Sequence, residues 1–159
     1  MGSRSKIHLA YVAGFLDGDG SLMLQIKNRK DGKSKRRFMA TICLYQDSRH
    51  AKTLLWIRDL FGIGYISERN DGMTELRING FAQVRIILKA LRPFIRFKKD
   101  QARALYEAVD LLSKKSLAKL NKQELLQIIE CIITIQSNNY ATRHKKTKKE
   151  LMKLLDLTP

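Results

Sequence analysis

The chain has 159 residues, with 31 Lys and Arg against 15 Asp and Glu, so its formal net charge is +16. A chain of this length forms one domain and buries a core without a disulfide or a metal staple, and the two isolated cysteines argue against a zinc site or a disulfide framework. The charge predicts a polyanionic partner, since a basic surface this large is seldom only a solubility device.

Apolar runs in the sequence are too short to cross a bilayer, and no signal-peptide core follows the N-terminus. We therefore expect an intracellular protein that is not secreted and has no membrane partner. Which intracellular compartment holds it is left open by the sequence.

The first half of the chain predicts a helix, a hairpin, a second helix and a second hairpin. The helix covers residues 7–18 with Ser5 as its N-cap. Strands with alternating apolar residues follow at 21–29 and 37–45. Ser48 is predicted to cap the next helix, which extends to residue 60. The second hairpin pairs strands 65–69 and 73–78 around Asn70-Asp71-Gly72, a strong turn signal.

The second half is predicted to be helical. A helix over 81–91 ends before Pro93, another covers 99–112, and a capping box of Asn121 and Glu124 opens a long helix toward residue 137. The whole chain is read as one domain over 1–159, with residues 1–6 flexible and a basic C-terminal segment over 140–159 that contains a short helix. The order αββαββα plus C-terminal helices is an α+β pattern with a four-stranded antiparallel sheet.

Three small residues recur at every fourth position of the first helix: Ala10, Gly14 and Gly18. They form one bare stripe, against which a second helix can pack unusually closely. Each helical glycine costs roughly 1 kcal/mol relative to alanine, and close helix approach is a reason to keep it. Asp17 and Asp19 follow at the end of the helix.

The run from Val12 to Gly20 resembles the signature of the LAGLIDADG homing endonucleases, with both carboxylates in register. The motif occurs once, and in that family a single copy implies a homodimer whose motif helices pack together. The resemblance therefore implies a dimer interface at five residues, with Asp17 in a structural role at the base of the helix pair: Ala10, Ala13, Gly14, Asp17 and Gly18.

The resemblance also implies a catalytic site. Asp19 corresponds to the metal-binding carboxylate, one per subunit, with the Gly18 carbonyl as a further ligand. Mg²⁺ is the expected cofactor, because it accepts one or two carboxylates together with phosphate oxygens, and Ca²⁺ or Mn²⁺ could substitute in crystals or assays.

Three further residues take the places of supporting catalytic groups in this resemblance. Gln46 would orient solvent, and Lys98 would stabilise the phosphate or act on the water, although Lys99 or Arg96 could hold that place instead. His50 stands where relatives carry a basic residue.

The polar face of the predicted sheet mixes donors and acceptors, as base reading requires. Arg can bridge the O6 and N7 atoms of guanine, Gln the N6 and N7 atoms of adenine, and Glu can accept from cytosine. The family uses its curved sheet as a saddle along the major groove. The alternative is a solvated face that is merely basic. The predicted DNA-binding residues are Met23, Gln25, Lys27, Arg29, Arg37, Thr41, Tyr45, Ser67, Arg69, Glu75 and Arg77.

The resemblance thus implies a site-specific homing endonuclease that hydrolyses both strands of a long pseudo-palindromic DNA site as a Mg²⁺-dependent homodimer. An intron-encoded enzyme is favoured, because no protein-splicing domain is visible in the sequence. Two alternatives on the same scaffold stay open: an RNA maturase of its host intron, with secondary RNA binding, and a DNA-binding protein that does not cleave.

Overall fold

The computed structural model describes residues 5–31, 35–140 and 142–158. The order of elements confirms the predicted αββαββα pattern with further helices. Helix α1 begins at Lys6, one residue before the predicted start, and residues 1–4 lie outside the described ranges. The elements are α1 (Lys6–Asp19), β1 (Gly20–Asn28), β2 (Arg36–Asp47), α2 (Lys52–Phe61), β3 (Tyr65–Glu68), β4 (Met73–Asn79), α3 (Phe81–Leu91), α4 (Lys99–Leu112), α5 (Lys122–Asn138) and α6 (Lys148–Leu154).

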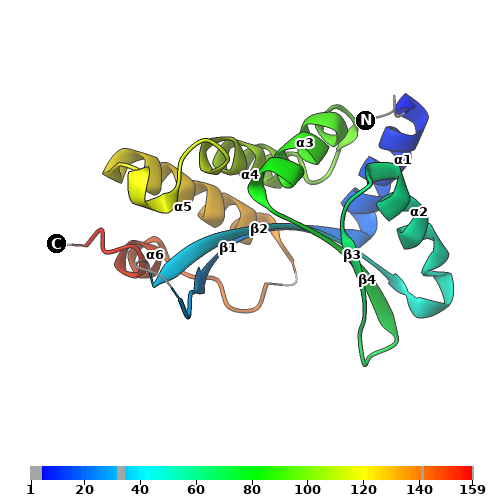
Figure 1. The fold of residues 1–159 in the computed structure, drawn as a ribbon, viewed down its shortest axis with the longest axis horizontal. Coiled ribbons are helices and arrows are strands. Elements are labelled where there is room, and N and C mark those ends of the chain that lie inside the picture. The colour runs from blue at the N-terminus through cyan, green and yellow to red at the C-terminus, as the bar shows by residue number, and fades with distance from the viewer. Residues whose placement is uncertain (1–4, 32–34, 141, 159) are drawn as a thin grey trace.

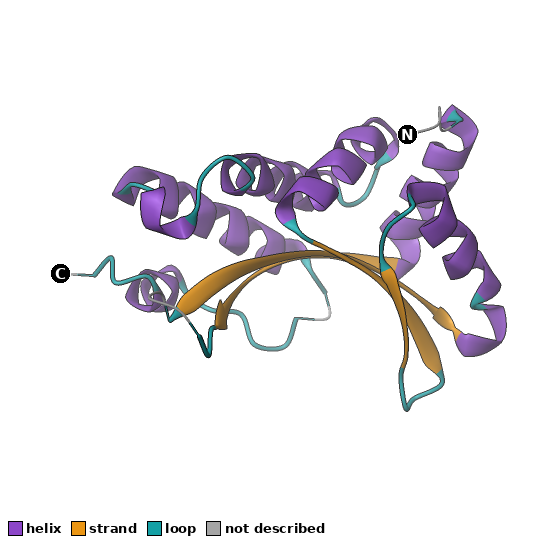
Figure 2. Ribbon diagram, in the orientation of Figure 1, coloured by secondary structure: helices purple, strands orange, loops and turns teal. Residues whose placement is uncertain are grey.

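The four strands form one antiparallel sheet in the order β1-β2-β4-β3, with β2 and β4 in the centre. Both hairpins predicted from the sequence are present, and β2 joins them by pairing with β4. The sheet curves as an arch, with α3, α4 and α5 over its convex side, whereas the segment after α5 and helix α6 lie below its β1–β2 end (Figures 1 and 2). This arrangement gives the molecule one long polar surface.

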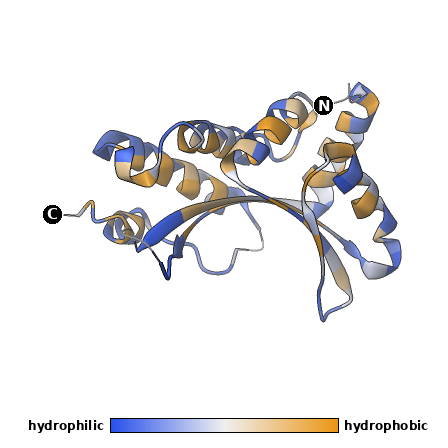
Figure 3. Ribbon diagram, in the orientation of Figure 1, coloured by the Kyte–Doolittle hydropathy of each residue, from blue (hydrophilic) through white to orange (hydrophobic). Residues whose placement is uncertain are grey.

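Alternation along the strands places one set of side chains in the core. Leu22, Ile42 and Leu76 are among the buried residues of β1, β2 and β4, and they belong to the same apolar cluster as Val12 and Leu16 of α1. Figure 3 shows apolar residues concentrated in the helices and the middle of the sheet, whereas the end of the β1–β2 hairpin is hydrophilic. The polar sheet surface is therefore held in place by a continuous core behind it.

Two of the three predicted helix caps are confirmed. The Ser5 hydroxyl accepts from the His8 N–H at 3.1 Å, and Asn121 and Glu124 form the capping box of α5. The prediction for Ser48 is wrong: a short 3₁₀ helix, η1 (Ser48–His50), precedes α2, and the Asp47 carboxylate caps it.

The Ser48 hydroxyl is instead hydrogen-bonded to that of Thr74 in β4, the strand paired with β2, which ends at Asp47. None of the helices within the described ranges is long and apolar enough to cross a membrane.

Candidate functional site

Asp17 ties the C-terminal turn of α1 to the segment between α3 and α4. Its carboxylate accepts from the backbone N–H groups of Arg96 at 2.6 Å and Lys98 at 3.0 Å. The Lys98 ammonium donates in return to the carbonyl oxygen of Asp17 at 2.5 Å. These three bonds fix Lys98 at the end of the helix that carries Asp19.

A groove of about 710 Å³ opens at this helix end. Three of the four residues predicted to be catalytic line it: Asp19 at the end of α1, Gln46 near the end of β2, and Lys98 just before α4. His50 is exposed at the end of η1 and does not belong to the groove lining. The fold thus gathers residues that lie up to 79 positions apart in the sequence, from Asp19 to Lys98.

The far wall of the groove was missed by the sequence reasoning. It comes from Asn138, the last residue of α5, and from Asn139 and Tyr140 just after it. The Asn139 side chain donates to the carbonyl oxygen of Leu22 at 3.0 Å, which fastens this segment to β1. No local motif marks these residues, because their place depends on a contact across more than a hundred positions.

The environment of Lys98 favours the neutral amine more than water does. Partial burial of the side chain lowers its pKa, while the negative charges of Asp17 and Asp19 oppose that shift. A lysine in such a place therefore loses its charge at a lower pH than a surface lysine does. Its cationic form suits an anionic group bound in the groove.

The amide of Gln46 is held at one end only. Its Oε1 atom accepts from the N–H of Asp47 at 2.8 Å, which fixes the orientation of the side chain at the groove. The Nε2 group makes no hydrogen bond to other residues in the described part of the chain. It is therefore a donor available to solvent or to a bound phosphate.

The oxygen atoms at the end of α1 suit a hard divalent cation as ligands. Asp19 is exposed, the last carbonyl groups of a helix lack partners within the helix, and the last turn of α1 carries no basic residue. The negative end of the helix dipole adds to the attraction for a cation. Among the described residues no group of three or more His, Cys, Asp and Glu side chains gathers, so the fitting ion is one that takes its other ligands from water or phosphate, as Mg²⁺ does.

The concave sheet face carries the predicted DNA-binding residues at different depths. Lys27, Arg29 and Arg37 are exposed at the outer end of the β1–β2 hairpin, and Arg69 is exposed at the end of β3. Five others are partly exposed along the strands: Met23, Gln25, Tyr45, Ser67 and Arg77.

Two predicted DNA-binding residues are buried, which corrects the expectation that they face a ligand directly. Thr41 has 0% of its surface exposed, and its hydroxyl donates to the Asn79 side chain at 2.6 Å. Glu75 is 5% exposed and accepts hydrogen bonds from two arginines. Both stand on the central strands β2 and β4, which have neighbouring strands on either side.

The outer face of α1 carries most of the predicted dimer interface. Ala10, Gly14 and Gly18 are exposed, and a Cβ atom added to either glycine would meet nothing within 4 Å. Packing within the chain therefore gives no reason for these glycines. Ala13 is fully buried, because it lies about 100° around the helix from Gly14 and faces the core, so the structure removes it from the exposed stripe.

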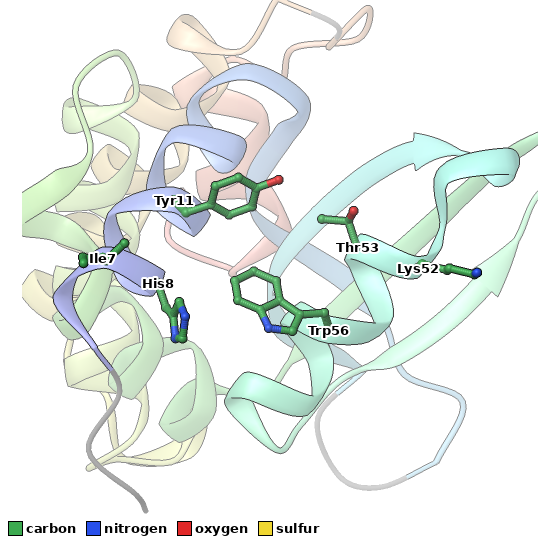
Figure 4. A pocket seen from close by; sticks show the side chains of 6 residues that line it. All are labelled: Ile7, His8, Tyr11, Lys52, Thr53 and Trp56. Carbon is green, nitrogen blue, oxygen red and sulfur yellow. The ribbon is translucent and has the colours of Figure 1, made fainter.

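An apolar hollow of about 420 Å³ continues the outer face of α1 toward its N-terminus, as Figure 4 shows. Ile7 and Tyr11 of α1 border it and are 79% and 53% exposed. Trp56 of α2 forms its floor, and the rings of His8 and Tyr11 meet the indole edge-on at centroid distances of 5.3 and 5.6 Å. Exposed apolar surface of this kind marks a place for a partner.

The sequence of this chain is similar to those of known endonucleases. The LAGLIDADG endonuclease family matches residues 12–102. The chain is 30% identical to DNA endonuclease I-CvuI of Chlorella vulgaris over 107 residues, which are 67% of this chain and 66% of that protein. It is 27% identical to DNA endonuclease I-CreI of Chlamydomonas reinhardtii over 152 residues, or 96% of this chain and 91% of that protein.

Solved structures share the fold over nearly the whole chain. The archaeal intron-encoded homing endonuclease I-Vdi141I, complexed with DNA, has a TM-score of 0.79 at 19% identity and covers 96% of this chain and 97% of its own. I-CvuI in complex with its target has a TM-score of 0.78 at 22% identity, covering 97% and 98%. I-SmaMI bound to cleaved DNA, with a TM-score of 0.73 at 21% identity, matches 98% of this chain with only 49% of its own.

Proposed function

The chain belongs to the LAGLIDADG endonuclease family, and from this premise we propose that it is a site-specific homing endonuclease that cuts both strands of duplex DNA as a homodimer. The observation that carries the proposal is the groove, which joins Asp19, Gln46 and Lys98 at the end of the motif helix. Intact catalytic groups favour a cleaving enzyme over a binding protein on the same scaffold.

The proposal of a homodimer is supported by the outer face of α1. One chain supplies one Asp19, whereas two strands require two catalytic centres. The open space over Gly14 and Gly18 allows a second α1 to approach closely, and the hollow beside Ile7 and Trp56 adds apolar surface to the same side. The match of this chain to only 49% of I-SmaMI leaves that protein room for two such units in one chain.

In the proposed reaction Asp19 and the Gly18 carbonyl would hold Mg²⁺, and the bound ion would supply an activated water and neutralise charge on the scissile phosphate. Lys98 places its ammonium charge at the phosphate, where the bonds of Asp17 hold it in position. Gln46 donates its free amide N–H to the attacking water or to a phosphate oxygen, which orients the attack in line with the leaving 3′ oxygen. The role of His50 stays a prediction.

The concave sheet face supplies recognition in this proposal. A curved ribbon of strands fits the major groove, where each base pair shows its own pattern of donors and acceptors. The exposed cations at the end of the β1–β2 hairpin grip phosphates, and the partly exposed residues nearer the centre reach base edges.

Selection of cleavable sites tests the proposal. A library of long randomised duplexes is incubated with the protein and Mg²⁺, and newly formed ends are captured and sequenced. We expect one family of near-palindromic sites cut in both strands, and no cutting when EDTA removes the metal. The Asp19→Asn variant should bind the selected site with unchanged affinity and cut it on the order of 1,000-fold more slowly, because a metal-binding charge is lost.

The matched control is Asp59→Asn, which removes an exposed carboxylate of α2 far along the chain from the motif. It should cut at the normal rate. Cutting that persists in the Asp19→Asn variant, or a library without any enriched site, would contradict the proposed function.

A further inference from the structure

A buried carboxylate lies beneath the DNA-reading face proposed above. Glu75 sits in the middle of β4, opposite Tyr45 of β2 and Ser67 of β3. Its Oε1 atom accepts from Nη1 of Arg69 at 3.0 Å, and its Oε2 atom accepts from Nε of Arg77 at 2.6 Å. Both carboxylate oxygens are therefore engaged, each by a different arginine.

Burial and these two bonds disfavour the direct cytosine contact that the sequence suggested for Glu75. With 5% of its surface exposed and both oxygens already accepting, it has little capacity left to accept a hydrogen bond from a cytosine. Burial of a charge is tolerated because two guanidinium groups compensate it, and removal of the carboxylate would leave two like charges side by side. The pKa of each guanidinium is raised by its bond to Glu75, so the pairing favours the charged form of both.

The two arginines are restrained to different degrees. Arg69 is held twice, since its Nη2 atom also pairs with Asp71 at 2.8 Å. Arg77 is held through Nε alone, and its Nη1 and Nη2 groups have no other partner among the described residues. A guanidinium fixed at Nε presents its two terminal nitrogens as a preoriented fork, and a fork of this kind matches the O6 and N7 atoms of a guanine edge.

We propose that Glu75 is a positioning residue for base selection: it holds Arg77 so that the terminal nitrogens of this arginine select a guanine in each half of the target. The inference rests on the proposed function, because it requires duplex DNA on the concave face. It assigns the selectivity to a side chain that does not touch DNA. Arg69, which is paired with the carboxylates of Asp71 and Glu75, contributes positive charge and shape to the same part of the face.

The test compares base preferences of variants on one probe, a randomised duplex library bound in Ca²⁺ buffer and sequenced after separation of bound from free DNA. The wild-type protein should show a guanine preference at one position in each half-site. In the Glu75→Gln variant this preference should fall by roughly 5-fold to 150-fold, the value of one bidentate base contact, with other positions unchanged. The Arg77→Lys variant should lose preference at the same position, since an ammonium group offers no fork.

A double variant sharpens the test. The double variant Glu75→Gln with Arg77→Lys should have the same guanine preference as Arg77→Lys alone. Both changes remove the same Arg77–guanine contact, so their effects should not add. The matched control is Glu68→Gln on the adjacent strand, which removes an exposed carboxylate from the same hairpin and should leave the profile intact. Thermal unfolding of each variant identifies loss of fold, and if Glu75→Gln fails to fold, Arg77→Lys alone still decides.

Two results distinguish a failure of this inference from a failure of the proposed endonuclease function. A wild-type protein that enriches no sequence would overturn both. A wild-type protein with a defined site whose guanine preference survives Glu75→Gln or Arg77→Lys, or drops equally at all positions, would overturn the positioning role alone.

Discussion

The groove at the end of α1 and the concave sheet face adjoin each other but are built in different ways. The groove depends on a few groups placed by backbone bonds, such as those that Asp17 receives from the loop before α4. The sheet face spreads many side chains along regular strands, and at its outer end they are exposed cations. Chemistry at one point tolerates little displacement, whereas recognition is shared among many contacts.

The largest expected effect comes from blocking dimerisation, which the groove needs for cutting both strands. Gly14→Leu adds bulk where the protomer itself has open space, so the fold should keep its stability. The dissociation constant of the dimer should rise roughly 100-fold or more, because overpacking costs about 1–3 kcal/mol at each of two symmetric sites. Analytical ultracentrifugation measures the association, and a cleavage assay should show loss of double-strand cutting.

The control for this change is Ala82→Leu, a similar increase in size on the exposed face of α3. It should leave both the association and the cutting unchanged. If the Gly14→Leu protein dimerises and cuts normally, the close helix contact is refuted, and the second chain would have to dock on another surface.

The next effect concerns the groove alone. Lys98→Met should slow cutting by roughly 100-fold, typical of losing one preorganised charge at a reacting phosphate, while affinity for the site changes little. Single-turnover kinetics and binding measured on the same duplex separate the two quantities. Equal losses in binding and cutting would place Lys98 in recognition instead of chemistry.

The pH dependence of cutting sharpens the role of Lys98. Burial lowers the pKa of Lys98, so its ammonium group loses its proton at a lower pH than that of a surface lysine. The cutting rate of the wild-type enzyme should therefore begin to fall at a correspondingly lower pH. Lys98→Arg keeps its charge and should show no such decline. A rate that instead rises as Lys98 loses its proton would show that the neutral amine acts on the water.

A smaller effect belongs to the outer sheet face. Arg37→Gln removes one exposed cation from β2 and should weaken binding to every sequence alike. The plot of log affinity against log salt should become shallower by about 1 for each protomer, the sign of one lost phosphate contact. A change of base preference at a single position would place Arg37 among the base readers.

The smallest effect tests whether Thr41 belongs to the core or to the recognition surface. Thr41→Val removes a buried hydroxyl that donates to Asn79 and should lower the free energy of unfolding by about 1 kcal/mol. Urea unfolding measures this change. Base preferences should stay as they are, and an altered preference with unchanged stability would restore the original prediction of DNA contact.

Local patterns in the sequence were reliable where neighbours in the chain decide the outcome. The alternation of β1 and β2, the turn at Gly72 and the capping box of Asn121 and Glu124 all formed as predicted. Ser48 shows the limit of such reasoning, since its hydroxyl bonds to Thr74 across the sheet instead of capping a helix. A cap is a local interaction, but the competing partner is visible only in three dimensions.

The amino-acid sequence was enough to identify the family, the order of elements and the carboxylate at the end of α1, because a contiguous motif and short-range periodicity carry that information. Tertiary structure decided which residues share the groove, which side of α1 is open, and that Glu75 braces two arginines instead of facing DNA. These outcomes depend on burial and on contacts between distant segments. They follow from how the strands and helices pack together. The spacing of residues within a single helix or strand does not contain that information.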